Sequence, residues 1–310
     1  MNKPKALKIG DTIGLVAPSS ALRQAGDLEK CISTLQEQGF KLVVGESCAS
    51  RQGYLSGSDE VRAGDINRMF GDSKIDAVFC LKGGYGTPRI LDLLDYETIK
   101  KNPKIFIGYS DITAIHIALN QKCDLITFHG PMVASDMLGD FDEFSKKSYL
   151  KAITAKEPLG KMDNPLGFEI KSMVPGKAKG IMVGGNLSLV AATIGTDYEI
   201  DTRGKILFLE DIEEFTYSVD RMLTQLRLSG KLKDCVGIVL GEFTNCLPQY
   251  QGFDHSLMQV FNEIIVQAKK PTIYNFRAGH CTPKITIPLG VETFLDADCC
   301  MLTITGSALK

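Results

Sequence analysis

The chain has 310 residues, of which 44% are hydrophobic and 23% are charged. This length and composition describe a globular protein with room for two domains of ordinary size, and they give no sign of disorder. The 35 basic and 37 acidic residues leave a net charge of −2, with no block of lysine and arginine that could bind nucleic acid or an anionic membrane. Nucleic acid and membrane are therefore not expected partners.

The cysteines and the N-terminus indicate a cytoplasmic protein. The nine cysteines are scattered, odd in number and without a Cys-x-x-Cys pair, which is typical of buried thiols in a reducing compartment. The apolar run 12–18 is too short and too interrupted for the core of a signal peptide, and no apolar segment is long enough to span a membrane.

In the first half of the chain, short β-branched runs alternate with helical patterns. The predicted strands are 12–17, 41–46, 75–81, 104–109 and 124–129, and the predicted helices are 22–39, 58–70, 87–95 and 111–120. This alternation predicts a parallel sheet covered by helices on both faces. Ligands of such sheets bind at the carboxyl ends of the strands, where Gly83-Gly84-Tyr85-Gly86 and Ser110 are expected.

The pattern loosens between Pro131 and Pro175 and then resumes with a different character. A charged helix is predicted near 141–155, followed by helices at 187–194, 213–230 and 255–269 and by β-rich runs at 180–186, 205–210, 236–243, 271–276, 285–294 and 300–305. We therefore predict an α/β fold in three parts. A mostly parallel N-terminal α/β sandwich domain covers 1–150, a linker covers 151–175, and a smaller mixed α/β domain with more antiparallel character covers 176–310.

Ser110 lies where an apolar strand ends and a helix begins, in the segment Lys104 to Thr113. A turn of this kind holds the hydroxyl next to the unpaired N–H groups of the helix, which would stabilise an oxyanion formed on the serine. The simpler interpretation is a helix N-cap, with Asp111 adding favourable charge in the first turn.

A nucleophilic serine needs a base, and the four histidines differ in their suitability for that role. His116 lies inside the helix after Ser110 and is expected to be structural, and His255 opens a surface helix. His129 ends a strand at the ligand-binding edge and could line a pocket. His280 follows a strand and Gly279, which frees the backbone to aim the imidazole.

Two carboxylates, Glu210 and Asp211, end the apolar strand that begins at Lys205. Each could cap the next helix or orient a buried histidine. Because neighbouring residues of a strand point to opposite sides, only one of them can face a given site. Strand alternation leaves the choice between them open.

The glycine-rich loop 83–86 could hold an anion on its backbone N–H groups, either a phosphate or an oxyanion. It lacks the spacing of the dinucleotide fingerprint and the Lys-Ser/Thr pair of the P-loop. No metal-binding motif was found, so no metal site is expected.

Taken together, these motifs resemble the LD-carboxypeptidase family of serine peptidases, which includes murein tetrapeptide carboxypeptidases and microcin-C-type immunity peptidases. The resemblance runs along almost the whole chain. The matching segments are Gly10-Asp11-Thr12-Ile13, Ala17-Pro18-Ser19-Ser20, Gly83-Gly84-Tyr85-Gly86, Gly108-Tyr109-Ser110-Asp111, His129-Gly130-Pro131-Met132, Gly184-Gly185-Asn186-Leu187, Leu209-Glu210-Asp211 with Glu214, and Gly279-His280.

The resemblance implies a catalytic triad of Ser110, Glu210 and His280, with oxyanion donors at the backbone N–H of Asp111 and of Gly84. It also implies a site between the two domains, a homodimer and no cofactor. One departure is Lys82, where relatives often carry arginine before the glycine loop; lysine lacks the bidentate fork for a carboxylate.

The implied reaction is cleavage of the bond between an L-diamino acid and a C-terminal D-alanine in murein tetrapeptides, which reach the cytoplasm during cell-wall recycling. Within the family, the alternative is a peptidase of microcin-C-type peptidyl-nucleotides. That substrate calls for an aromatic stacking surface, and the chain has no tryptophan. An alternative of another class is a non-catalytic protein that binds an anion or a sugar phosphate.

Overall fold

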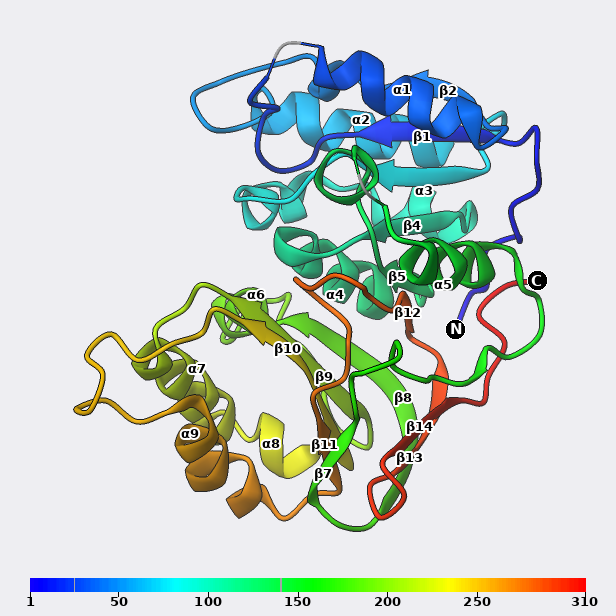
Figure 1. Ribbon diagram of the computed structural model, residues 1–310. Coiled ribbons are helices and arrows are strands. Elements are labelled where there is room, and N and C mark those ends of the chain that lie inside the picture. The colour runs from blue at the N-terminus through cyan, green and yellow to red at the C-terminus, as the bar shows by residue number, and fades with distance from the viewer. Residues whose placement is uncertain (25, 140) are drawn as a thin grey trace. The chain divides into compact units, whose positions relative to one another are not determined.

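Two units, each built around its own β-sheet, make up the chain (Figure 1). The computed structural model describes residues 1–24, 26–139 and 141–310. Unit 1 contains Met1–Glu157, Thr286–Gly290 and Ala308–Lys310, and unit 2 contains Pro158–Ile285 and Val291–Ser307. Two short pieces from the C-terminal part of the sequence therefore belong to the first unit.

The sheet of unit 1 has six strands in the order β12-β5-β4-β3-β1-β2. These are β1 (Thr12–Val16), β2 (Lys41–Val44), β3 (Ala77–Cys80), β4 (Ile105–Gly108), β5 (Thr127–His129) and β12 (Ile287–Leu289). Strands β1 to β5 are parallel, and β12 adds an antiparallel edge beside β5. The predicted, mostly parallel α/β architecture is confirmed.

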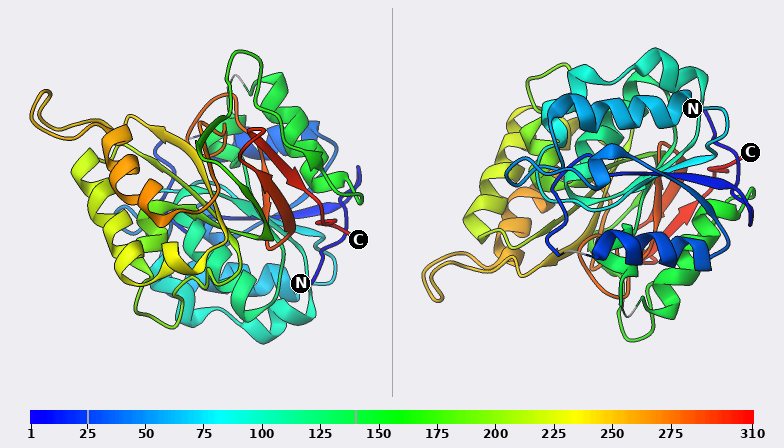
Figure 2. Two further views of the ribbon diagram at one scale, coloured as in Figure 1. Left: turned by 90° about the horizontal axis from the view of Figure 1, so that it is seen from below. Right: turned by 90° about the horizontal axis from the view of Figure 1, so that it is seen from above.

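Helices cover both faces of this sheet, and α1 and α2 lie on opposite faces (Figure 2, right). The helical elements of unit 1 are α1 (Asp27–Glu37), η1 (Glu46–Cys48), α2 (Asp59–Gly71), η2 (Thr87–Leu93), α3 (Tyr96–Lys101), η3 (Ser110–Ile112), α4 (Thr113–Lys122), η4 (Val133–Met137) and α5 (Glu143–Thr154). Position 25, within the predicted helix 22–39, lies outside the described residues.

The prediction of a helix over 87–95 was wrong in kind. The chain forms the 3₁₀ segment η2 there, and a separate helix, α3, begins after Asp95. The Asp95 carboxylate accepts a hydrogen bond from the Thr98 N–H at 2.9 Å, which caps α3 and separates the two elements.

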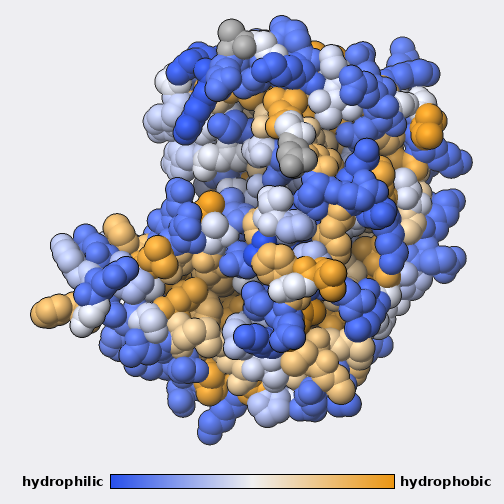
Figure 3. Space-filling view, viewed as in Figure 1, coloured by the Kyte–Doolittle hydropathy of each residue, from blue (hydrophilic) through white to orange (hydrophobic). Residues whose placement is uncertain are grey.

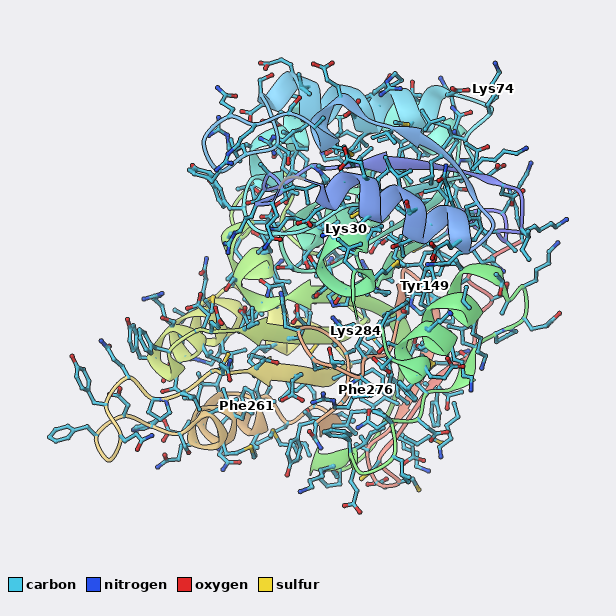
Figure 4. The ribbon with its side chains drawn as sticks, turned by 45° about the horizontal axis from the view of Figure 1, so that its top comes forward. Lys30, Lys74, Tyr149, Phe261, Phe276 and Lys284 are labelled. Carbon is cyan, nitrogen blue, oxygen red and sulfur yellow. The ribbon has the colours of Figure 1, made fainter. Side chains whose placement is uncertain are left out.

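The core of unit 1 lies around its two central strands, because every residue of β3 and β4 is buried. On one side the Phe79 ring packs edge-to-face against Tyr149 of α5, with ring centroids 6.2 Å apart; Figure 4 labels Tyr149. Such burial fixes the carboxyl ends of both strands, from which the glycine loop and Ser110 follow.

The sheet of unit 2 has eight strands in the order β6-β14-β13-β8-β9-β10-β11-β7. These are β6 (Gly160–Lys161), β7 (Lys171–Val174), β8 (Lys177–Asn186), β9 (Ile206–Ile212), β10 (Gly237–Thr244), β11 (Thr272–Tyr274), β13 (Glu292–Asp296) and β14 (Met301–Ile304). Strands β8 to β11 are parallel and the outer strands are antiparallel, as expected for a mixed sheet. Strands β6 and β7 fall within the segment 151–175.

The helical elements of unit 2 are α6 (Leu187–Ala192), α7 (Thr216–Leu228), α8 (Lys231–Asp234), α9 (Leu257–Ile264) and η5 (Val266–Ala268). The segment after β10, gold in Figure 1, projects from this unit. It carries three exposed large apolar side chains, Leu247, Tyr250 and Phe253, and hydrophobic residues are visible on the projection in Figure 3. Within the described part of the chain, no helix is long and apolar enough to cross a membrane.

Candidate active site

Ser110 occupies a sharp turn directly after the buried strand β4. Its φ of 65° lies in the left-handed region, which a residue with a Cβ rarely adopts, and η3 and then α4 begin at this point. At Gly108 an added Cβ would lie 3.0 Å from Ile112 and 3.1 Å from Cys80, so this approach to the turn requires glycine. The turn has the strained strand-to-helix form that presents a nucleophile.

The glycine loop after β3 passes directly against this serine. A Cβ added at Gly83 would lie 3.1 Å from the Cβ of Ser110 and 3.3 Å from its Oγ. Gly84 has a φ of 122°, and a Cβ there would collide with the Ser20 side chain. The sequence-predicted pair of Ser110 and the glycine loop is thus brought together within unit 1.

Asp111 is buried beside the same turn, with 1% of its surface exposed. Its Oδ2 accepts hydrogen bonds from Ser19 Oγ at 2.6 Å and from the Thr87 N–H at 2.9 Å. Burial raises the pKa of this carboxyl, and the hydrogen bonds oppose that rise. Asp111 therefore connects the turn of Ser110 with two neighbouring loops.

Within unit 2, Glu210 and His280 form a hydrogen-bonded pair. The Glu210 side chain is completely buried at the end of β9, and its Oε2 accepts from His280 Nδ1 at 2.7 Å and from the His280 backbone N–H at 3.2 Å. A carboxylate on Nδ1 fixes the tautomer that leaves the lone pair on Nε2. Asp211, the other candidate from the sequence, does not take this place.

Gly279 makes the pair possible. Its φ is 108°, and an added Cβ would lie 2.7 Å from Cγ and 2.8 Å from Cβ of Glu210. No other residue type would let the backbone run this close to the carboxylate while turning both N–H groups of His280 toward it.

Asp211 has a different role, at the start of α6. Its carboxylate accepts from Asn186 Nδ2 at 2.8 Å and from the N–H and Oγ of Ser188 at 3.0 and 2.8 Å. Burial, together with the nearby Glu210 charge, raises the pKa of Asp211 to about 6. This carboxylate holds the ends of β8 and β9 and the first turn of α6 together.

The other histidines are placed for structural roles. His116 is fully buried, its Nε2 donates to the Gly108 carbonyl at 2.8 Å, and burial lowers its pKa to about 4. His129 is also buried, with its ring 5.7 Å from that of Tyr109. His255 lies at the surface beside Glu263.

Sequence reasoning missed Arg277, which braces the loop that carries His280. Its guanidinium donates to Glu242 Oε2 at 2.7 Å and to the Thr282 carbonyl at 2.9 Å, and lies 4.2 Å from the centroid of the Phe168 ring. The preceding residue, Phe276, is fully buried (Figure 4). No local pattern marks Arg277, because all its partners except Thr282 come from distant parts of the sequence.

The described residues contain no cluster of three or more His, Cys, Asp or Glu side chains that could hold a metal ion. Each unit holds a group of a kind that serine hydrolases use: in unit 1 a strained strand-to-helix turn at Ser110 with the glycine loop against it, and in unit 2 a histidine held by a buried carboxylate.

Comparison with known proteins identifies the family of this chain. Residues 13–130 match the model of the LD-carboxypeptidase N-terminal domain, and residues 179–295 match that of the C-terminal domain. A probable murein peptide carboxypeptidase of Bacillus subtilis is 44% identical, over 95% of this chain and 91% of that protein.

Solved structures give the same result. The microcin C7 self-immunity protein MccF in complex with glutamyl sulfamoyl guanosine has a TM-score of 0.91 at 27% identity, covering 99% of each chain. A muramoyltetrapeptide carboxypeptidase from Oxalobacter formigenes has a TM-score of 0.84 at 28% identity, covering 96% of this chain and 100% of that one. With both domain models matched and this identity along its length, the chain belongs to the LD-carboxypeptidase family of serine peptidases.

Proposed function

We propose that the protein cleaves the bond between the L-centre of a diamino acid and the C-terminal D-alanine of murein tetrapeptides. The observation that carries the proposal is the contact between the buried Glu210 carboxylate and His280 Nδ1, which prepares the histidine as a base. The name of the Bacillus subtilis relative, a probable murein peptide carboxypeptidase, supports this choice of substrate.

In the proposed mechanism Ser110, His280 and Glu210 act as one triad. The Ser110 hydroxyl attacks the scissile carbonyl while His280 Nε2 takes its proton and then delivers it to the leaving amine of D-alanine. Glu210 holds the imidazole tautomer and stabilises the imidazolium that forms. Water then hydrolyses the acyl-enzyme, with His280 again acting as the base, and no cofactor takes part.

The oxyanion would be held by the backbone N–H groups of Asp111 and Gly84. The first turn of a helix has N–H groups without partners inside the helix, and Asp111 occupies that turn. The close packing of the glycine loop on Ser110 supports a donor from that loop.

The setting in the cell is part of the proposal. We infer a cytoplasmic enzyme of cell-wall recycling that works as a homodimer, as the family resemblance implies. Size-exclusion chromatography with light scattering measures the oligomeric state, and a single-chain mass would contradict the dimer.

The deciding experiment is mass spectrometry of a purified murein tetrapeptide incubated with wild type and with Ser110→Ala, both with a metal chelator present. We expect wild type to release D-alanine and a tripeptide, and the variant to release neither. Cleavage by Ser110→Ala at the wild-type rate would refute the proposed nucleophile, and a wild type that does not cleave the tetrapeptide would favour a peptidyl-nucleotide peptidase or a binding protein.

A second candidate is hydrolysis of a peptidyl-nucleotide, favoured by the structural likeness to MccF bound to glutamyl sulfamoyl guanosine. Its test is incubation of the wild type with glutamyl sulfamoyl guanosine in the same assay. A higher kcat/KM for this compound than for the tetrapeptide would favour the second candidate.

A further inference from the structure

The loops around Ser110 are connected by side chains that have no part in the proposed proton transfers. The loop Pro18–Ser20 follows β1, and the loop Gly83–Thr87 follows β3. Ser20 Oγ accepts a hydrogen bond from the Tyr85 N–H at 3.1 Å, which joins these two loops.

Arg62 of α2 also joins these two loops, through hydrogen bonds to a carbonyl of each. Its side chain is completely buried, and its Nη1 donates to the Pro18 carbonyl at 2.5 Å and to the Gly86 carbonyl at 2.9 Å. The ion pair with Asp59 holds the guanidinium in place. The two loops are therefore connected to each other in one layer at the carboxyl ends of the strands.

Asp111 attaches this layer to the nucleophile turn. One carboxylate oxygen, Oδ2, accepts from Ser19 in the first loop and from the Thr87 N–H in the second. The Thr87 hydroxyl in turn donates to the Asp111 carbonyl. These three hydrogen bonds are buried, where the loss of a partner costs more than at a surface.

We propose that the Asp111 carboxylate is a positioning residue, which fixes the Gly83–Gly86 loop against Ser110 so that the loop N–H groups point to the site of the oxyanion. The inference rests on the proposed acyl transfer, and it assigns a task to the Asp111 side chain that is separate from that of its backbone N–H. Because oxyanion donors act only when correctly placed, this carboxylate should affect the transition state more than substrate binding.

The test compares Asp111→Ala, Asp111→Asn and Ser19→Ala by kcat and KM on the tetrapeptide. An asparagine can place its carbonyl oxygen where Oδ2 lies and keep both hydrogen bonds, whereas alanine loses both. We expect kcat to fall about 10- to 100-fold in Asp111→Ala with little change in KM, a smaller fall in Ser19→Ala, and substantial recovery in Asp111→Asn.

The matched control is Asp76→Asn, because Asp76 accepts a backbone hydrogen bond from Thr12 at the opposite edge of the same sheet. It should keep the wild-type kcat. A peptide boronic acid, with boron in place of the scissile carbonyl carbon, measures binding of the tetrahedral state. Its affinity should fall by the same factor as kcat/KM, which a merely structural defect would not produce.

A wild-type kcat and boronate affinity in Ser19→Ala and in a folded Asp111→Ala would overturn the inference. If Asp111→Ala does not fold, Ser19→Ala decides it. If wild type does not cleave the tetrapeptide, the rate at which a fluorophosphonate labels Ser110 replaces kcat. Slower labelling in the variants then supports the positioning role although the substrate proposal has failed, and equal labelling overturns it.

Discussion

The turn of Ser110 and the Glu210–His280 pair position their side chains by different means. Ser110 is placed by its own neighbours in sequence: a buried strand before it, a left-handed φ, and a helix directly after it. His280 is placed by residues far away in sequence, with Glu210 seventy positions earlier and Glu242 and Phe168 bracing the loop through Arg277. A locally built site can be read from a short motif, whereas a site built from long-range contacts depends on the whole unit.

For the Glu210–His280 pair, the largest effect on kcat is expected from Glu210→Gln. A glutamine amide can donate to Nδ1 and favour the wrong tautomer, so kcat should fall about 10³- to 10⁴-fold while the fold is kept. Steady-state kinetics measures the loss, and ¹⁵N NMR of the His280 ring reports the tautomer. Glu263→Gln, on the surface of α9, is the control, and an unchanged kcat in Glu210→Gln would remove Glu210 from the triad.

Gly279→Ala should come next. The added methyl group would meet the Glu210 side chain, and the φ of 108° is unfavourable for alanine, so the pair is displaced. A displacement of the order of 1 Å costs about 100-fold in kcat. Gly230→Ala is a matched control, because Gly230 also has a positive φ but no atom lies within 4 Å of the added Cβ.

The Gly230 variant should lose stability in thermal unfolding but retain kcat. Equal kcat values in the two glycine variants would mean that contact with Glu210 is not what requires Gly279.

Arg277→Lys tests the long-range brace with a smaller change. Lysine keeps the charge but cannot donate to Glu242 and to the Thr282 carbonyl with one planar group, and it loses the stacking on Phe168. We expect kcat to fall about tenfold through a less ordered His280 loop. Arg221→Lys, whose guanidinium lies over the exposed Tyr217 ring, should leave kcat unchanged; a similar result for Arg277→Lys would argue against the brace.

The last prediction concerns the stability of the protein and not its activity, at Asp211. Its folded pKa of about 6 lies above the ordinary pKa of 3.8 for an aspartate, so between these pH values the native state holds a proton that the unfolded chain releases. Its contribution to stability is present below about pH 4 and is lost as the pH rises to 6, by on the order of 3 kcal/mol. Chemical unfolding of wild type and Asp211→Asn at several pH values measures it. Parallel curves from pH 4 to 6 would show that Asp211 does not titrate as stated.

Much of the candidate site could be predicted from the sequence, because its motifs lie where strands end. The prediction that Gly83–Gly86 and Ser110 meet at one edge was correct, since the carboxyl ends of parallel strands share that edge. The choice between Glu210 and Asp211 could not be made from strand alternation, because each carboxylate has hydrogen-bond partners on its own side of the strand. Glu210 contacts His280, and Asp211 contacts Asn186 and Ser188. The predicted β-run 285–294 is divided between the two units, because β12 pairs in unit 1 and β13 in unit 2. Local sequence patterns could not predict this division.

The sequence by itself determined the α/β class, the strand-to-helix turn at Ser110 and the family, because these depend on local periodicity and short motifs. Only the tertiary structure decided that Glu210 contacts His280, that Arg277 braces the His280 loop, and that the Asp111 carboxylate joins three separate loops. The physical reason is that a buried hydrogen bond depends on which segments pack together, and strand order and register set that packing across tens of residues.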